Sequence, residues 1–291
     1  MSVLRRGDDG PEVTELQERL RDLGFDAAGE FGEVTELAVI RFQESRGLLP
    51  DGIVGPITRE ALAEDEPGGG GGGEEEAGPP VDRSLRLDDG QFLDQPFPKS
   101  LIVLHHTAGA SAASTVRWWN TGDPRRIATA YVIARSGAIH EVFDPRFWAF
   151  HLGLAGSGGR VDRRSIGIEL ASEGPLTREG DRFFAFGGSN SGTEYTGERV
   201  DLDEPWREES HFAAYTEEQV TSAIALTDHL CSVFALPRKT PGDHLSFDRA
   251  LWDFRGVVGH HHVRPDKTDL HPGFPWHRLV DGAGLELVPE G

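Results

Sequence analysis

Histidines and a carboxylate lie next to short apolar stretches at two distant places in this 291-residue sequence. His105 and His106 come directly after the apolar residues 101–104, and three histidines at residues 260–262 follow Gly-Val-Val-Gly. Apolar runs of this length predict buried strands. Histidine nitrogens and a carboxylate oxygen on rigid strand ends are ligands that zinc prefers. A catalytic zinc needs three protein ligands and a fourth position open to water, and His105, one histidine of the triplet and Asp269 meet that count.

The residue types alone leave alternatives open at this site. A histidine pair is more often an ordinary surface or core feature than a metal site. The triplet followed by Lys267 and Asp269 is the stronger signal, and an incidental polar loop is the alternative to it. For Glu169 the alternative is a salt bridge at a strand end, and for Lys267 it is a solvated loop charge.

Further segments predict the elements that must hold these residues. Three of them have the length and pattern of strands: residues 130–135, 138–142 and 165–170. Thr216 and Gln219 form a capping box ahead of an apolar helical series that ends before Pro237. Strands and helices that intermix along the chain predict an α/β domain with a mixed β-sheet flanked by helices.

A glycine-rich boundary divides the sequence. Six glycines at residues 68–73 are followed by glutamates at residues 74–76. Both features favour a flexible chain, because glycine loses the most entropy on ordering and like charges repel. The sequence therefore predicts residues 1–66 as a small domain, residues 67–92 as a linker and residues 93–291 as the larger domain.

Three short helices around one apolar core are expected in the small domain. Pro11 begins the first helix and Gly24 ends it, the second runs from about Thr35 to Arg46, and Pro56 begins the third. No catalytic chemistry is apparent in this part of the sequence. The residues predicted to form the core are Val13, Leu16, Leu20, Leu23, Leu37, Ala38, Ile40, Phe42, Ile57, Ala61 and Leu62.

The small domain resembles the peptidoglycan-binding type-1 domain over residues 3–63. The resemblance rests on Leu-Gln at residues 16–17, Gly-Glu-Phe-Gly at 29–32, Phe-Gln at 42–43 and Asp-Gly-Ile-Val-Gly-Pro-Ile-Thr at 51–58. It implies that this domain binds peptidoglycan, and a generic three-helix bundle is the alternative. The residues that would contact the glycan or the stem peptide are not evident from the sequence.

The larger domain resembles the type-2 N-acetylmuramoyl-L-alanine amidases over roughly residues 95–280. Four motifs occur in the family's order: Val-Leu-His-His-Thr-Ala-Gly at residues 103–109, Trp148 with His-Leu-Gly at 151–153, Ser-Ile-Gly-Ile-Glu-Leu at 165–170, and residues 259–273. Members of the family use zinc to hydrolyse the amide between N-acetylmuramic acid and L-alanine in peptidoglycan. The resemblance implies the same reaction, with Zn2+ as cofactor and the glycan strand and stem peptide of peptidoglycan as partner.

The resemblance also implies a role for each residue of the site. His105, His260 and Asp269 correspond to the zinc ligands, and Glu169 and Lys267 to the catalytic pair. Because zinc lowers the pKa of its bound water toward about 7, Glu169 would take the proton of that water and pass it to the leaving amine. Lys267 would stabilise the oxyanion that develops on the lactyl carbonyl.

The histidine triplet makes the second zinc ligand ambiguous. The family's Gly-His-x-x-Val-x-Pro phrase selects His260, whereas a spacing of eight residues to Asp269 selects His261. We favour His260 because Val263 and Pro265 then occupy the Val and Pro positions of that phrase. His262 is the least favoured of the three.

Three residues are expected to contact the substrate: His151, Trp118 and Thr107. His151 would hydrogen-bond the substrate or the oxyanion rather than bind zinc. Trp118 and its neighbour Trp119 would line a sugar-binding face, although an aromatic pair is as often part of a core. Residues 174–215 have the character of an insertion, which would serve either as a substrate-facing loop or lid or as a passive surface segment.

Composition limits the partners and the setting. The sequence contains 29 Lys and Arg against 49 Asp and Glu, and the net charge of −20 disfavours a nucleic-acid partner. The sequence contains no run of about 18 apolar residues, so we expect no insertion into a membrane. The polar N-terminus shows no leader, so we expect synthesis in the cytoplasm and release to the cell wall by lysis or a non-standard export route. We also expect the protein to be a monomer.

Two other functions remain as alternatives to the amidase. A non-catalytic peptidoglycan-recognition protein would share the fold, and a zinc peptidase would cut within the stem peptide. The joint presence of the three proposed ligands, Glu169 and Lys267 favours the enzyme over the recognition protein. A phage endolysin and a bacterial autolysin are equally compatible with the sequence.

Overall fold

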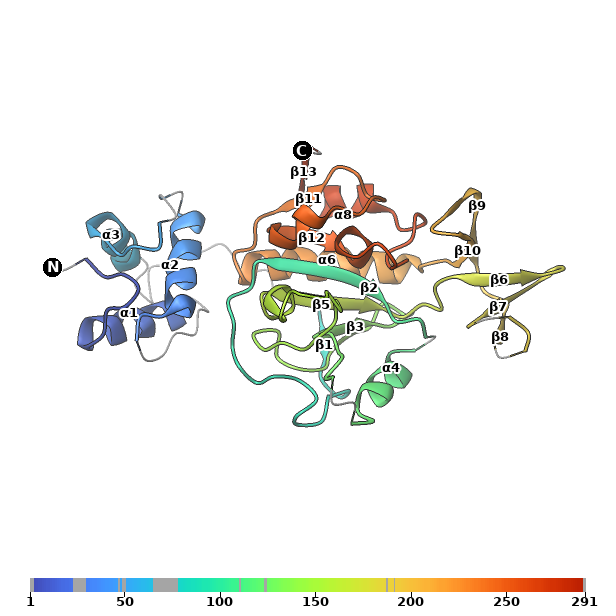
Figure 1. Cartoon of the computed structure of the whole chain (residues 1–291), viewed down its shortest axis with the longest axis horizontal. Coiled ribbons are helices and arrows are strands. Elements are labelled where there is room, and N and C mark those ends of the chain that lie inside the picture. The colour runs from blue at the N-terminus through green and yellow to red at the C-terminus, as the bar shows by residue number, and fades with distance from the viewer. Residues whose placement is uncertain are drawn as a thin grey trace. The chain divides into compact units, whose positions relative to one another are not determined.

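The computed structural model divides the chain into two compact units, one formed mainly by residues 1–77 and one comprising most of residues 78–291. The elements of both units are labelled in Figure 1. The residues described are 3–22, 30–46, 48, 51–64, 78–109, 111–122, 125–186, 188–190 and 192–289. Leu23, Gly24, the side chain of Leu37, and the glycines and glutamates at residues 68–76 lie outside the described part of the chain.

Three helices form the first unit, as predicted: α1 (Pro11–Asp22), α2 (Glu33–Ser45) and α3 (Pro56–Glu64). Ile57 does not join their core and is 67% exposed, because it lies on the outward side of the first turn of α3. The prediction for this residue was wrong. The core consists of Leu4, Val13, Leu16, Leu20, Phe31, Ala38, Val39, Phe42, Val54 and Leu62.

A buried glutamine explains the Asp-Gly-Ile-Val turn of this unit. The side-chain amide of Gln43 on α2 donates to Asp51 Oδ1, to the Ile53 carbonyl and to Thr58 Oγ1, at distances of 2.8 to 3.1 Å. Its Oε1 accepts from the Gly52 N–H at 2.9 Å. One side chain therefore satisfies three polar groups of the turn and one of α3, and it fixes the turn against α2.

A six-stranded mixed sheet is the centre of the second unit, in the order β1-β4-β3-β5-β2-β12. β3, β5, β2 and β12 are parallel to one another, and β4 runs antiparallel to β3. The predicted α/β class with a mixed sheet is confirmed. The strands are β1 (Val81–Asp82), β2 (Leu101–His106), β3 (Tyr131–Ile133), β4 (Ile139–Glu141), β5 (Ser165–Leu170) and β12 (Gly256–Gly259).

The long helix α6 (Glu217–Val233) lies behind β2 and β5 in the view of Figure 1. The predicted capping box is present, because Gln219 N–H donates to Thr216 Oγ1 and Thr216 N–H donates to Gln219 Oε1. The amide of Gln219 also donates to the carbonyls of Ile133 and Ala171, at the ends of β3 and β5. This contact fixes the start of α6 at the edge of the sheet where those strands end.

The described residues of segment 174–215, referred to below as the insertion, form two small antiparallel sheets. One consists of β6 (Leu176–Glu179), β7 (Arg182–Ala185) and β8 (Thr193–Tyr195), and the other of β9 (Arg199–Trp206) and β10 (Glu209–Ala213). Figure 1 shows both beyond the end of the central sheet at which β2 and β5 stop. Leu176, Phe183, Ala185 and Ala213 form a separate buried cluster.

Shorter elements complete the second unit. β11 and β13 pair in parallel, apart from the central sheet. Among the described helices, none combines the length and the apolar character needed to cross a bilayer. The remaining elements are α4 (Ala112–Trp119), α5 (Arg160–Arg163), the 3-10 helix η1 (Arg249–Asp253), α7 (His260–Val263), α8 (Trp276–Gly282), β11 (Lys239–Pro241) and β13 (Glu286–Val288).

Candidate metal centre and active site

Parallel pairing brings the predicted site residues together at the carboxyl ends of three strands. β2 lies between β5 and β12, and the register sets His105 opposite Glu169 and Leu104 opposite Gly259. His260 follows Gly259 directly as the first residue of α7, so its ring reaches the end of the strand beside His105. Side chains that are 155 residues apart in the sequence therefore meet.

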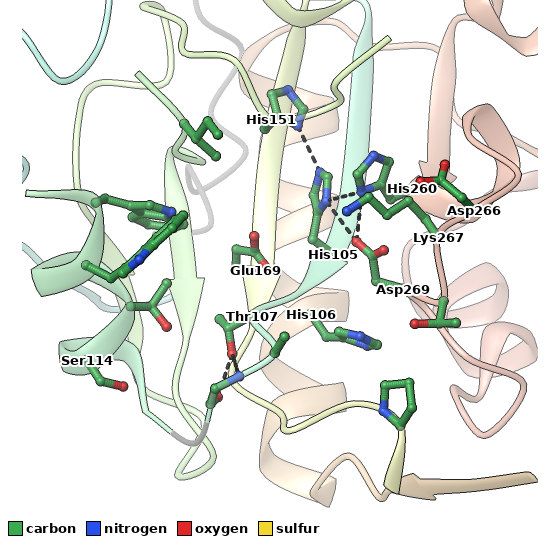
Figure 2. Close-up of a pocket in the computed structure, with 18 residues that line it drawn as sticks. His105, His106, Thr107, Ser114, His151, Glu169, His260, Asp266, Lys267 and Asp269 are labelled. Atoms are coloured by element: carbon green, nitrogen blue, oxygen red, sulfur yellow. Dashed lines mark hydrogen bonds and ion pairs between the residues drawn. The ribbon is translucent and has the colours of Figure 1, made fainter. Parts of the chain in front are cut away.

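Three buried ligand atoms converge at this point. His105 Nδ1 lies 3.0 Å from His260 Nδ1 and 3.0 Å from Asp269 Oδ2, and His260 Nδ1 lies 3.0 Å from the same carboxylate oxygen. Figure 2 shows the three side chains turned toward one another. Within the described ranges, this is the one group of three or more His, Cys, Asp or Glu side chains close enough to share an ion.

Hydrogen bonds behind His105 determine which of its nitrogens faces the group. The Ser165 hydroxyl donates its single hydrogen to the Asp162 carbonyl, so His151 Nε2–H donates to Ser165 Oγ at 2.7 Å. His151 Nδ1 is then an acceptor, and His105 Nε2–H donates to it at 2.9 Å. His105 Nδ1 consequently carries a lone pair directed at Asp269.

The backbone of residues 151–153 orients the second histidine. His260 Nε2–H donates to the Leu152 carbonyl at 3.0 Å, which leaves His260 Nδ1 as a lone pair as well. Arg264 Nη1 donates to the same carbonyl at 3.2 Å. Gly153 has a φ of +62°, and a Cβ at this position would lie 2.2 Å from Arg264 Nη1. The glycine thus leaves room for the guanidinium beside the carbonyl.

Protonation states favour a cation at the meeting point of these groups. Burial, together with His260, lowers the pKa of His105 to about 4, so its ring is neutral at neutral pH. Three electron-pair donors at 3.0 Å repel one another unless a cation lies between them. Two imidazole nitrogens and one carboxylate oxygen suit zinc.

Glu169 lies at the end of β5 beside this group (Figure 2). Its Oε2 is buried and has no hydrogen-bond partner within the part of the chain that the structure describes. Burial and the negative charge of Asp269 raise the pKa of Glu169 well above its ordinary value, and Lys267 opposes that rise. A half-buried carboxylate with one buried, unpaired oxygen and a raised pKa favours a proton-transfer role over the alternative of a strand-end salt bridge.

A pocket of about 630 Å³ opens over the site. Lys267 extends over the histidine group in Figure 2, and Trp118 on α4 is 54% exposed at the pocket, whereas its neighbour Trp119 is buried. Every residue predicted from the sequence to act in the site lines this pocket: His105, Thr107, Trp118, His151, Glu169, His260, Lys267 and Asp269.

The other triplet histidines are directed away from the ligand group. His261 lies between two carbonyls, with Nδ1 3.0 Å from Asp269 O and Nε2 2.9 Å from His244 O. His262 accepts the Gly259 N–H on Nδ1. His260 is therefore the member of the triplet that joins the group, as the Gly-His-x-x-Val-x-Pro phrase predicts.

Two of the predicted substrate contacts are occupied within the protein. Both ring nitrogens of His151 are hydrogen-bonded, to His105 and Ser165, which favours an orienting role over a contact with substrate. The Thr107 hydroxyl donates to the Gly109 carbonyl at 2.6 Å and so shapes the pocket wall.

Sequence reasoning missed Ser165. A usable signal is its position four residues before Glu169 on the same strand, since residues i and i+4 of a strand share a face. A Cβ at residue 167, between them, would lie 2.6 Å from Thr129 Cγ2 and 3.1 Å from His151 Nδ1, so the glycine there makes room for both side chains.

Both parts of the chain match families of known proteins. Residues 95–274 match the N-acetylmuramoyl-L-alanine amidase family, and residues 9–62 match a family of peptidoglycan binding domains. N-acetylmuramoyl-L-alanine amidase CwlL of Bacillus licheniformis is 39% identical over 67 residues, which is 21% of this chain and 19% of that protein. The spore cortex-lytic enzyme of Bacillus cereus is 42% identical over 65 residues, 21% of this chain and 25% of the enzyme. The matches thus span about a quarter or less of these relatives.

Solved structures show more distant similarity. A complex of the N-acetylmuramyl-L-alanine amidase AmiD from E. coli with anhydro-N-acetylmuramic acid-L-Ala-D-gamma-Glu-L-Lys is 20% identical, with a TM-score of 0.43. The match covers 68% of this chain and 62% of AmiD. The catalytic domain of XlyA is 15% identical, also with a TM-score of 0.43, and the match covers 71% of this chain and 100% of that domain.

Proposed function

Since this chain belongs to the N-acetylmuramoyl-L-alanine amidase family, we propose that it is a zinc-dependent enzyme that hydrolyses the lactyl amide between N-acetylmuramic acid and L-alanine in peptidoglycan. One structural observation supports the proposal independently of family membership. Two imidazole lone pairs and the Asp269 oxygen converge within 3.0 Å of one another, beside the unpaired carboxylate of Glu169.

The described side chains suggest how the reaction proceeds. His105, His260 and Asp269 would hold the zinc ion, which supplies Lewis acidity that lets water ionise near neutral pH. Glu169 takes the proton of the attacking water and delivers it to the leaving amine of L-alanine, and its raised pKa suits it to keep the proton between the two transfers. Lys267 donates to the oxyanion on the lactyl carbonyl.

The N-terminal part has a proposed role of its own. The match of residues 9–62 to peptidoglycan binding domains supports residues 1–66 as an anchor on the polymer. Residues 67–92 would then serve as a tether for the catalytic domain, residues 93–291. Both parts would act on the same substrate, the bacterial cell wall.

Metal analysis and product analysis together test the proposal. We expect about one zinc per chain, and mass spectrometry of digested muropeptides should show peptides with a free L-alanine amine and intact N-acetylmuramic acid. Glu169→Gln should keep the zinc and lose about 10²- to 10⁴-fold in turnover, the usual contribution of a general acid–base residue. Products cleaved within the stem peptide would show a peptidase. Absence of zinc with no clearing of sacculi would show a recognition protein.

A further inference from the structure

We propose that Arg207, in the insertion, is a positioning residue that holds the metal-binding loop, defined here as residues 260–269, in its catalytic geometry. The inference rests on the proposed function, because this loop contains two of the proposed zinc ligands and Lys267. It also gives the insertion a task, as a brace for the site rather than a lid or a passive surface segment.

The guanidinium of Arg207 donates to four backbone carbonyls of this loop. Nη2 donates to His261 O at 3.0 Å, and Nη1 donates to Arg264 O at 3.1 Å, to Pro265 O at 2.8 Å and to Lys267 O. α7 is a single turn, so its last carbonyls lack helical partners, and the carbonyls that follow it also need donors. The planar, permanently charged guanidinium satisfies these carbonyls together. It thereby restricts the segment between His260 and Asp269 to one conformation.

The backbone of Arg207 is unusual for its residue type. Arg207 and Glu208 form the two-residue turn between β9 and β10, with φ values of +52° and +70°. Turns with two positive φ values are ordinarily made by Asn and Gly, because a side chain is disfavoured in this conformation. The four contacts with the loop hold the arginine in place despite that preference.

The same hairpin contacts the chain on both sides of Asp269. Ahead of it, the Trp206 ring packs edge-on against His261, with 5.4 Å between ring centroids. After it, Phe212 stacks on His271 at 4.5 Å, and His271 Nε2–H donates to a backbone carbonyl of β10 at 3.1 Å. Both ends of the segment that presents Asp269 are therefore fixed to one element outside the central sheet.

Loss of the guanidinium should change the chemical step more than substrate binding. Catalytic groups must be held within about 0.5 Å of their productive positions. Without Arg207 the loop carbonyls turn to water, and Lys267 and Asp269 sample a wider range of positions. Arg207 is not among the described residues that line the pocket, so we expect kcat to fall about ten-fold with KM nearly unchanged. The dissociation constant for Zn2+ should rise about ten-fold.

Arg207→Gly and Glu208→Gly form a matched pair for the test. Each replaces a positive-φ residue of the same turn by glycine, and only the first removes the guanidinium. The full chain loaded with zinc is assayed for kcat and KM on N-acetylmuramoyl-L-alanyl-D-isoglutamine. Zn2+ affinity is measured by chelator competition, and hydrogen exchange of residues 260–269 by mass spectrometry. We expect lower kcat, weaker zinc binding and faster exchange for Arg207→Gly, and values like the wild type for Glu208→Gly.

Wild-type kcat and zinc affinity in folded Arg207→Gly would overturn the inference. If that variant does not fold, Arg207→Lys decides, because it keeps a cation but lacks the planar fork. A partial loss of kcat supports the inference, and full activity overturns it. A wild-type protein that hydrolyses no muropeptide would refute the proposed function, and zinc affinity and exchange would still decide the role of Arg207.

Discussion

Single hydrogen bonds determine whether the ligand group can accept a cation. The Ser165 hydroxyl donates to the Asp162 carbonyl, so Ser165 Oγ can only accept from His151. His151 Nδ1 therefore accepts from His105 Nε2–H, and His105 Nδ1 keeps its lone pair. Such outer-shell partners orient a metal ligand and exclude the wrong tautomer. The site therefore depends on a residue that would touch neither the metal nor the substrate.

Ser165→Ala should weaken zinc binding without unfolding the protein. The change removes the acceptor of His151 Nε2–H, so the His151 ring can adopt the other tautomer and turn an N–H toward His105. We expect the dissociation constant for Zn2+ to rise about 10- to 100-fold in chelator competition.

Ser222→Ala is the matched control for this experiment. Ser222 lies on α6, and its hydroxyl donates a comparable hydrogen bond to the Gly137 carbonyl, which this change removes. Zinc affinity should stay at the wild-type value in this variant. Equal affinities for the Ser165 and Ser222 variants would contradict the orienting role of His151.

The sequence predicted these residues unevenly, for a physical reason. His105 and Glu169 could be found because they lie at or near the ends of apolar segments, and parallel strands bring their ends together. Asp269 was found instead from its place a few residues after the histidine triplet. The choice between His260 and His261 could not be made from spacing, because ring direction depends on carbonyls from distant segments, such as the Leu152 carbonyl.

At the scale of elements, burial decided which strands could be predicted. β5 and β12 begin and end at the predicted residues, and both are almost wholly buried apolar segments. The insertion strands could not be found in this way, because β9 is exposed or half-buried along its whole length and β6 buries only Leu176. Their pairing follows from turns and from the neighbouring sheet rather than from an apolar pattern.

Two glycines in the segment between β4 and α5 allow a controlled test of its backbone. Gly156→Ala should destabilise the protein by about 1 kcal/mol, because its φ is +82° and nothing lies within 4 Å of the added Cβ. Gly153→Ala should lower the free energy of unfolding by the same amount for its backbone. It should lower it by about 1.5 to 3 kcal/mol more, because the added Cβ displaces the hydrogen bond of Arg264. Urea denaturation measures both, and equal losses would show that Arg264 moves aside freely.

For the molecule as a whole, buried histidines link stability to pH. Burial lowers the pKa of seven histidines: His105, His106, His151, His244, His261, His262 and His271. Each takes up a proton in the unfolded chain at about pH 6.5 and resists it when folded. The unfolded state thus binds more protons below that pH, so stability falls as the solution is acidified. Three carboxyl groups with raised pKa act in the opposite direction: Asp162, Glu169 and Glu209.

Urea denaturation of the metal-free protein at pH 7.5, 6.5 and 5.5 tests this balance. The free energy of unfolding should fall between pH 7.5 and 5.5, by up to about 1.4 kcal/mol for each histidine. His271→Phe keeps the ring stack with Phe212 and removes one titrating group, so its pH dependence should be shallower. A constant free energy across this range would contradict the prediction.

Removal of residues 1–66 tests whether the first unit anchors the protein and the second unit carries out hydrolysis. The shortened chain should bind sacculi more weakly and should hydrolyse small soluble muropeptides at the wild-type rate, because the described pocket residues all lie in the second unit. Co-sedimentation with sacculi and a soluble-substrate assay measure the two properties separately. Equal co-sedimentation of both forms would contradict the anchoring role.

The wide separation of the ligands along the chain has a consequence for biosynthesis. His105 is 155 residues from His260 and 164 from Asp269, so the ion-binding corner does not exist until β12 has docked beside β2. A ribosome-bound chain that stops short of Asp269 cannot assemble it. The proposed amidase activity would therefore be absent from truncated or partly translated products, and it would arise only in a polypeptide made past residue 269.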